Sequence, residues 1–158
     1  MDKKIKTNLL WGTYTWIVFH WLAEHVKEAE FKNERDTIIN HIYAICNNLP
    51  CPNCQSHAMA YLKANSMSVI KTKGDFKIYL YHFHNSVNKQ TKKKYEDYTI
   101  LNKYKFTNRS LMFHLWNKYY TMGNSINNND FMAKKKINEV KRMFLAYINT
   151  NHYKFLTI

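Results

Sequence analysis

Cys51 and Cys54 form a Cys-x-x-Cys motif, which carries the clearest chemistry in the sequence. Two thiols at this spacing can close into a disulfide and reopen, so the pair can accept and release two electrons. Proline is favoured at the first position of a helix, where its missing N–H costs nothing, so Pro52 predicts a helix with Cys51 at its N-cap. The positive end of the helix dipole stabilises a thiolate. The motif therefore favours a redox-active dithiol.

The same two cysteines permit a zinc site as an alternative. Cys51, Cys54 and His57 form a Cys-x-x-Cys-x-x-His pattern. Either His82 or His84 would complete a set of four ligands of the types that zinc accepts. The motif alone does not separate a zinc-binding helical module from a redox dithiol.

Cys46 is the third and last cysteine of the 158 residues. Three cysteines are too few for the disulfide framework that stabilises many small secreted proteins. Apolar residues at helical spacing surround Cys46, so we expect a buried thiol without a redox role.

Two further segments carry polar residues that an ordinary apolar helix would not need. Trp16 and His20 stand four residues apart and so share one face of a helix. His84 and Asn88 have the same spacing, and Asn85 stands between them. Asparagine is a poor helix former and is costly to bury without hydrogen bonds. Each histidine alone favours a structural role, whereas together with the dithiol they indicate a polar ligand.

The chain carries 24 Lys and Arg against 11 Asp and Glu, which gives a formal net charge of +13. Such basicity permits a nucleic-acid binder, because cations neutralise phosphates. The lysines are nevertheless spread along the chain, apart from runs at 92–94 and 134–136, and no recognition motif accompanies them. A solvated basic surface is the simpler interpretation, so no specific nucleic-acid partner is expected.

The composition favours one all-α domain. Hydrophobic residues make up 46% of the chain, and only 3 glycines and 2 prolines interrupt it. The sequence contains no stretch of about 18 apolar residues, so no membrane span is expected. The first residues lack the apolar run of a secretory signal, so cytosolic residence is expected.

Hydrophobic periodicity predicts four main helices with short connections, the pattern of an up-and-down bundle. Asn33 is the predicted N-cap of the second helix, with Asp36 at its N3 position, and Asp75 is the predicted cap of the fourth. The four helices and a less regular fifth segment are expected at residues 9–28, 34–48, 52–64, 76–92 and 96–120.

A last amphipathic helix is predicted at 131–149, after an Asn-rich break at 124–130. An apolar helix face of this kind must be covered by the bundle, by a second subunit or by a partner. We expect it to form an interface between subunits. Its apolar residues are Phe131, Ile137, Val140, Phe144 and Ile148.

Three motifs follow one another along the chain. They lie in WGTYTWIVFHWLA (11–23), LPCPNCQSHAMAYL (49–62) and FKIYLYHFHNSVNKQTKKK (76–94). Together they resemble the Erv/ALR family of FAD-linked sulfhydryl oxidases. The family's elements are Gly-x-x-x-Trp-x-x-x-His, then Pro-Cys-x-x-Cys, then His-x-His-Asn-x-Val-Asn followed by a basic residue. The small size of the chain resembles the versions carried by large cytoplasmic DNA viruses. So does its frequent use of Lys, Asn, Ile and Tyr, which is typical of proteins encoded by AT-rich genomes.

The resemblance implies a bundle of four helices with a short fifth, an FAD-binding domain at 1–120, and a helical extension at 121–158. It implies an FAD-dependent thiol oxidase that forms disulfides in protein dithiols. The electrons would pass to dioxygen and yield hydrogen peroxide. Cys51 and Cys54 would be the catalytic pair, with Cys54 nearer the flavin.

Carried over residue by residue, the resemblance also implies where FAD binds. Lys93 would supply a fixed cation beside the pyrophosphate, and Tyr98 would close the adenine side. No metal ligands are expected. The implied FAD contacts are Gly12, Trp16, His20, His84, Asn85, Val87, Asn88, Lys93 and Tyr98.

The chain departs from the family pattern at three positions. Thr13 stands where an arginine is common, His25 replaces a tyrosine, and Tyr81 replaces a cysteine whose disulfide staples the cellular members. A second Cys-x-x-Cys, the usual shuttle, is also missing from the sequence. The implied partner is therefore a separate protein dithiol, a small Cys-x-x-Cys or thioredoxin-like carrier. The resemblance further implies a homodimer and a late viral protein, located in the host cytoplasm or the virion.

Overall fold

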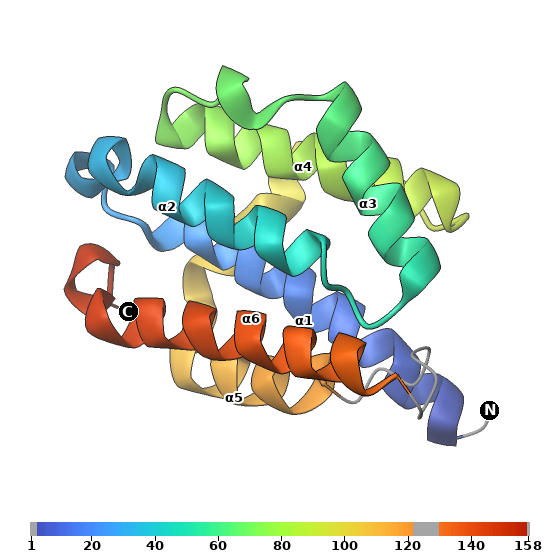
Figure 1. Cartoon of the computed structure of the whole chain (residues 1–158). Coiled ribbons are helices and arrows are strands. Elements are labelled where there is room, and N and C mark those ends of the chain that lie inside the picture. The colour runs from blue at the N-terminus through green and yellow to red at the C-terminus, as the bar shows by residue number, and fades with distance from the viewer. Residues whose placement is uncertain (1–2, 122–129, 158) are drawn as a thin grey trace.

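The computed structural model describes residues 3–121 and 130–157, with side chains from residue 10 onward. Within these ranges the chain is helical and forms no strand, which confirms the all-α prediction (Figure 1). One isolated antiparallel bridge joins Val26 and Phe155. The elements are α1 (Lys3–His25), α2 (Glu28–Cys46), α3 (Pro52–Ala64), η1 (Met67–Val69), α4 (Lys73–Gln90), η2 (Tyr98–Phe106), α5 (Arg109–Tyr120), α6 (Phe131–Thr150) and η3 (His152–Lys154).

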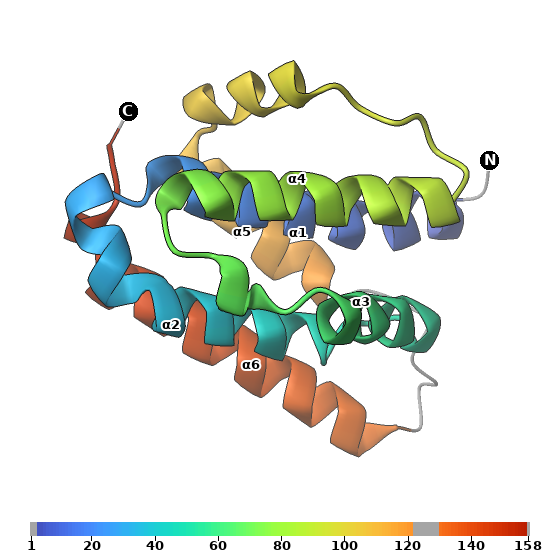
Figure 2. The ribbon, with the colours of Figure 1, turned by 90° about the horizontal axis from the view of Figure 1, so that it is seen from above.

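Helices α1 to α4 form the predicted bundle, and the remaining helices cover it. α1 packs beside α4, while α3 contacts both α2 and α4 (Figure 2). α5 lies along α1, and α6 lies along α2 (Figure 1). None of the helices in the described part of the chain is long and apolar enough to cross a membrane.

One large hydrophobic core holds the bundle and its cover together. Val18 of α1, Ile42 of α2 and Leu80 of α4 are completely buried. Trp116 of α5 and Phe144 of α6 are buried as fully, and their rings meet edge to face with centroids 5.4 Å apart. Burying a side chain of this size contributes about 1.5–3 kcal/mol. Helices α5 and α6 therefore share one hydrophobic core with α1 to α4.

The apolar face of α6 packs within the chain, so the expected interface between subunits is wrong for its buried residues. Phe144 contacts Phe113 of α5 and His41 of α2, with ring centroids 6.1 and 5.4 Å away. The helix itself spans residues 131–150, close to the prediction. The Asn-rich break before it lies, except for residue 130, outside the described residues. The buried residues of this face are Ile137, Val140, Phe144 and Ile148.

The predicted start of the second helix is wrong, because α2 begins at Glu28. Asn33 therefore lies inside the helix and does not cap it, and Asp36 is not at N3. Phe31 explains the earlier start: it is 2% exposed and stacks on Phe76 of α4 with centroids 5.7 Å apart. Tertiary burial thus extends the helix beyond the point that local capping signals favour.

The predicted cap of the fourth helix is also wrong. Thr72 is the N-cap of α4, and its hydroxyl accepts a hydrogen bond from the Asp75 N–H at 3.1 Å. The Asp75 carboxylate accepts one in return from the Thr72 N–H at 2.8 Å. This reciprocal capping box places Asp75 at N3. The predicted fifth segment is in fact two elements, because Asn108 caps α5 after η2 has ended.

Candidate active site

Helix α3 begins where the sequence predicts, and its first turn holds the two cysteines. Pro52 is the first helical residue, and Cys51 is the N-cap. The side chains of Cys51 and Cys54 form a disulfide, with Cα atoms 5.2 Å apart. The Cys54 N–H donates a hydrogen bond to Cys51 Sγ at 3.2 Å. When the disulfide opens, this N–H stabilises a thiolate on Cys51.

A cavity of about 700 Å³ opens beside the disulfide, between α1, α3, α4 and η2. Cavities that bind small molecules and cofactors usually enclose about 300–1,000 Å³. Its walls are mostly apolar and aromatic, with Trp11, Phe19 and Phe83 among them. Most of the predicted site residues lie in this lining: Gly12, Trp16, Cys51, Cys54, His84, Val87, Asn88 and Lys93.

The polar residues of α1 and α4 meet along one side of this cavity. The rings of Trp16 and His84 are stacked, with centroids 4.2 Å apart and planes 6° from parallel. Behind them, His20 Nε2 and His84 Nδ1 are 3.0 Å apart and share a hydrogen bond. His20 also stacks on Tyr104 of η2, with centroids 4.5 Å apart. The two motifs that the sequence singled out therefore form one aromatic and imidazole cluster.

Both imidazoles of this cluster are neutral near pH 7. Burial lowers the pKa of His20 from 6.5 to about 3, and the neighbouring His84 and Lys103 lower it further in the same sense. Burial, Lys103 and Lys93 likewise lower the pKa of His84 from 6.5 to about 4. A single shared hydrogen bond is what two neutral imidazoles can form.

Acid is expected to destabilise the fold through this pair. The unfolded chain binds protons at both imidazoles below about pH 6.5, whereas the folded chain does so only near pH 4 and pH 3. The pair's contribution to the free energy of unfolding is therefore fully present above about pH 6.5. It is lost as the pH drops from there, by up to about 1.4 kcal/mol per pH unit for each imidazole. Urea denaturation between about pH 7 and pH 5 measures the slope. The double variant His20→Leu, His84→Leu should show a shallower slope, and equal slopes would contradict the assignment.

A smaller recess of about 210 Å³ adjoins the cavity and shares His84, Asn88 and Lys93 with it. The predicted contacts His20 and Asn85 line this recess and not the larger cavity. Asn85 is 4% exposed. Its amide donates to the Glu96 carbonyl at 3.0 Å and accepts from the Glu96 N–H at 2.9 Å. Asn85 thus holds the backbone that leads into η2, and a contact with FAD stays a prediction.

Tyr98 is the one predicted contact that lines neither space. It is 44% exposed and packs edge-on against Tyr81, with ring centroids 5.3 Å apart. The remaining FAD contacts also stay predictions, although the structure gathers them in one place.

Two residues that the sequence did not predict line both the cavity and the recess. Lys103 and Tyr104 come from η2, and the Lys103 ammonium lies 5.0 Å from the centre of the Tyr104 ring. No motif marks η2. Asn85 and Tyr81 of α4 both hydrogen-bond the Glu96 backbone, which leads into η2, and so hold η2 beside the site. Its apolar residues predicted a fifth, less regular segment but no function.

The departures from the family pattern have clear positions in the structure. Thr13 lines the cavity. His25 is buried at the end of α1, with its ring nitrogens 3.2 and 3.3 Å from the carbonyl oxygens of Trp21 and Lys105. The Tyr81 hydroxyl donates to the Glu96 carbonyl at 2.9 Å. Where the family pattern has a stapling cysteine, this chain therefore has a hydrogen bond to the same segment that Asn85 holds.

The zinc alternative is not favoured. In the part of the chain that the structure describes, no group of three or more His, Cys, Asp or Glu side chains is placed to hold a metal ion. Cys51 and Cys54 are joined to each other, and His84 is hydrogen-bonded to His20.

Cys46 is buried, as the sequence predicts, and is 2% exposed. Burial raises the pKa of its thiol to about 12, which disfavours the reactive thiolate.

Comparisons with known proteins agree with this geometry. The model of the Erv1/Alr family matches residues 13–110. A protein of African swine fever virus named "FAD-linked sulfhydryl oxidase" is 34% identical over 86 residues, which are 54% of this chain and 71% of that protein. Protein 096R of Invertebrate iridescent virus 3 is 31% identical over 85 residues, or 53% of this chain and 57% of that protein. No solved structure gives a significant match.

Proposed function

This chain belongs to the Erv1/Alr family, and we propose that it is an FAD-dependent thiol oxidase. The observation that carries the proposal is a Cys-x-x-Cys disulfide in the wall of a cavity of about 700 Å³. An electron acceptor held in this cavity lies next to the sulfur atoms, while the outer side of α3 remains open to a substrate. The zinc module explains neither the cavity nor the imidazole cluster.

The residues present fit a flavin cofactor. A Cβ atom built on Gly12 would meet no atom within 4 Å, so the cavity wall at this point of α1 is open backbone. Trp16 and Phe83 supply flat apolar surface, which suits a planar ring. Lys93 and Lys103 supply two cations, which suit a diphosphate. We therefore assign FAD to this cavity and the adjoining recess.

Disulfide exchange uses only the sulfur atoms of this chain and of the substrate. A substrate thiolate attacks Cys51 Sγ and bonds to it, the Cys51–Cys54 bond breaks, and Cys54 leaves as a thiolate. The second substrate thiol loses its proton, attacks the substrate sulfur of this mixed disulfide, and releases Cys51 as a thiolate. The Cys54 N–H, 3.2 Å from Cys51 Sγ, stabilises that leaving thiolate. The substrate loses two electrons and two protons, and the pair Cys51–Cys54 gains the electrons.

When bound, FAD supplies the two-electron acceptor that restores the disulfide and returns the electrons to dioxygen as hydrogen peroxide. The chain's own residues prepare the place. Trp11, Phe19 and Phe83 line the same cavity as the disulfide and make this part of its wall apolar. The neutral imidazole of His84 adds a polar group without a competing charge.

The proposed function is tested on the purified protein. It should show the yellow absorption of a bound flavin, and it should consume oxygen when dithiothreitol is added, with hydrogen peroxide as product. A colourless protein that contains stoichiometric zinc would overturn the proposal in favour of the zinc module. A yellow protein that does not oxidise dithiothreitol would leave the cofactor in place but refute the activity.

Replacing Gly12 with leucine should prevent flavin binding without harming the fold. The new side chain enters open space in the cavity and not a packed core. Glycine in a helix costs about 0.5–1 kcal/mol relative to alanine, so replacing it should not weaken α1. We expect FAD affinity to fall at least about tenfold, measured by fluorescence titration of the flavin-free protein. Gly74→Leu, on the exposed start of α4, is the matched control and should bind FAD normally. Equal affinities in the two variants would contradict the placement.

The partners and the location are further proposals, supported by the resemblance to the family. We propose a protein dithiol as substrate, delivered by a small Cys-x-x-Cys or thioredoxin-like carrier, because this sequence contains one Cys-x-x-Cys only. We also propose a homodimer and a viral protein made late in infection, located in the host cytoplasm or the virion. Sedimentation of the purified protein tests the dimer, and fractionation of infected cells over time tests the rest.

A further inference from the structure

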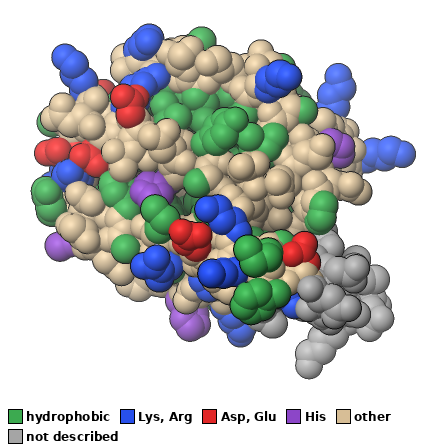
Figure 3. Space-filling view, in the orientation of Figure 1, with side chains coloured by type: hydrophobic (Ala, Val, Ile, Leu, Met, Phe, Trp, Pro, Cys, Tyr) green, Lys and Arg blue, Asp and Glu red, His purple; other side chains and the backbone are tan. Residues whose placement is uncertain are grey.

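The charges of the chain are unevenly distributed along the bundle. Of the 11 acidic residues, most belong to one end, where α1 ends, α2 begins and α4 begins. Figure 3 shows most of the acidic side chains in view on the left of the molecule, whereas Lys and Arg side chains are spread over both sides. The acidic residues of that end are Glu24, Glu28, Glu30, Glu34, Asp36 and Asp75.

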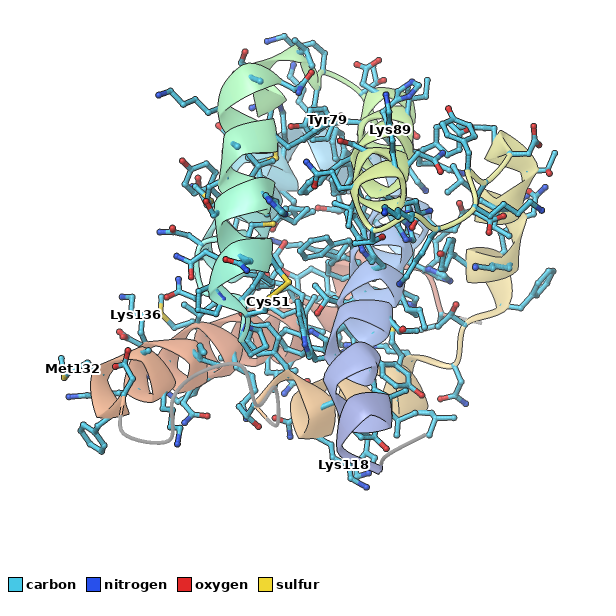
Figure 4. The ribbon with its side chains drawn as sticks, turned by 90° about the vertical axis from the view of Figure 1, so that its right-hand side faces the viewer. Cys51, Tyr79, Lys89, Lys118, Met132 and Lys136 are labelled. Carbon is cyan, nitrogen blue, oxygen red and sulfur yellow. A yellow bond between two sulfur atoms is a disulfide. The ribbon has the colours of Figure 1, made fainter. Side chains whose placement is uncertain are left out.

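The disulfide lies at the opposite end, and lysines surround it. The start of α3, the end of α4, the end of α5 and the start of α6 all meet there (Figure 1). Figure 4 looks onto this end and shows Cys51 near the centre, with Lys89, Lys118 and Lys136 around it on three different helices. All three lysines are exposed. We call this surface, defined by Cys51 and these three lysines, the basic face.

Few acidic groups offset the basic face. Residues 47–64, which form the α2–α3 loop and α3, contain no Asp or Glu. On α6, Glu139 pairs with Lys136 at 3.5 Å, but both side chains are about half exposed, so the pair is weak. Asp130 accepts the N–H of Ala133 as the cap of α6. At this end of the bundle, the three lysines of the basic face therefore outnumber the acidic residues Asp130 and Glu139.

We propose that the basic face captures acidic proteins that carry a reduced dithiol, and orients them on Cys51. The inference rests on the proposed function and names the class of substrate that the same disulfide serves. A patch of one charge sign speeds the encounter with partners of the opposite sign and disfavours other partners. A nucleic acid would match the charge, but it offers no thiol to the disulfide at the centre of the face.

The test compares two charge-reversal variants with the same change in net charge. The first is Lys89→Glu, Lys118→Glu, Lys136→Glu, and the control is Lys27→Glu, Lys32→Glu, Lys71→Glu, three exposed lysines toward the acidic end. The probes are reduced thioredoxin of acidic net charge and dithiothreitol, which is uncharged. For thioredoxin we expect kcat/KM of the first variant to fall at least about tenfold at low salt, and the loss to shrink as salt rises. The control variant should stay within about twofold of the wild type.

Dithiothreitol separates this inference from the proposed function. Both variants should oxidise it at the wild-type rate, because an uncharged thiol is not steered by the field. If the wild type does not oxidise dithiothreitol, the proposed function itself fails. If it does, and both variants slow equally with thioredoxin, the basic face has no role. Loss of duplex DNA binding in the first variant, without any loss toward thioredoxin, would show that the face serves nucleic acid instead.

Discussion

Replacing Cys54 with serine is expected to abolish thiol oxidation and to leave the fold and the flavin in place. A hydroxyl cannot form the disulfide that accepts the substrate's two electrons, so the rate should fall by at least about a thousandfold. Cys54 is half-buried in the first turn of α3, and serine is tolerated there because it differs from cysteine by one atom. Oxygen uptake with dithiothreitol and the visible flavin spectrum measure the two properties on the same sample.

Cys46→Ala is the matched control for this variant. Cys46 also lines the cavity, but its thiol is buried, and burial raises its pKa to about 12, so it does not form a thiolate near neutral pH. Turnover of Cys46→Ala should stay near that of the wild type. Retained turnover in Cys54→Ser, or a comparable loss in Cys46→Ala, would show that the reactive pair has been assigned incorrectly.

Phe144→Ala is expected to destabilise the whole domain by about 3–5 kcal/mol. Phe144 is completely buried and packs against α2 and α5, so its removal leaves a cavity where α6 meets the bundle. The free energy of unfolding from urea denaturation measures the change. Phe131→Ala provides the control on the same helix, since Phe131 is 73% exposed and its loss should cost less than about 0.5 kcal/mol. If the two substitutions cost the same, α6 is a dispensable appendage.

The parts of the fold that the sequence predicted well are those set by local signals. Pro52 and Cys51 fix the start of α3 through proline geometry and a side-chain cap, and the structure reproduces both. The start of α2 was missed because it depends on burial of Phe31 against Phe76, from a helix far along the chain. Periodicity showed that α6 has an apolar face, but it could not show which surface covers that face.

The site was predictable in its motifs and not in its supporting loop. Trp16 and His84 were identified by their spacing, and the structure stacks them at the cavity wall. Lys103 and Tyr104 were missed because a 3-10 segment without a motif carries them to the site. Asn85 illustrates the opposite case: its type and position indicated a ligand, but both groups of its amide bond the Glu96 backbone.

The buried side chain of Glu34 has a consequence for the order of events during synthesis. Burial alone would raise the pKa of its carboxyl, but hydrogen bonds from Lys154 and Tyr147 lower it, so the charge is stable only when those partners are present. They follow Glu34 by 120 and 113 residues. The bundle gains the apolar cover of α6 only after residues 131–150 have left the ribosome, and it gains this cation only after residue 154 has done so. Contacts of such long range form late and leave apolar surface exposed in the nascent chain. The oxidase therefore completes this part of its core only after residues 131–155 have been translated.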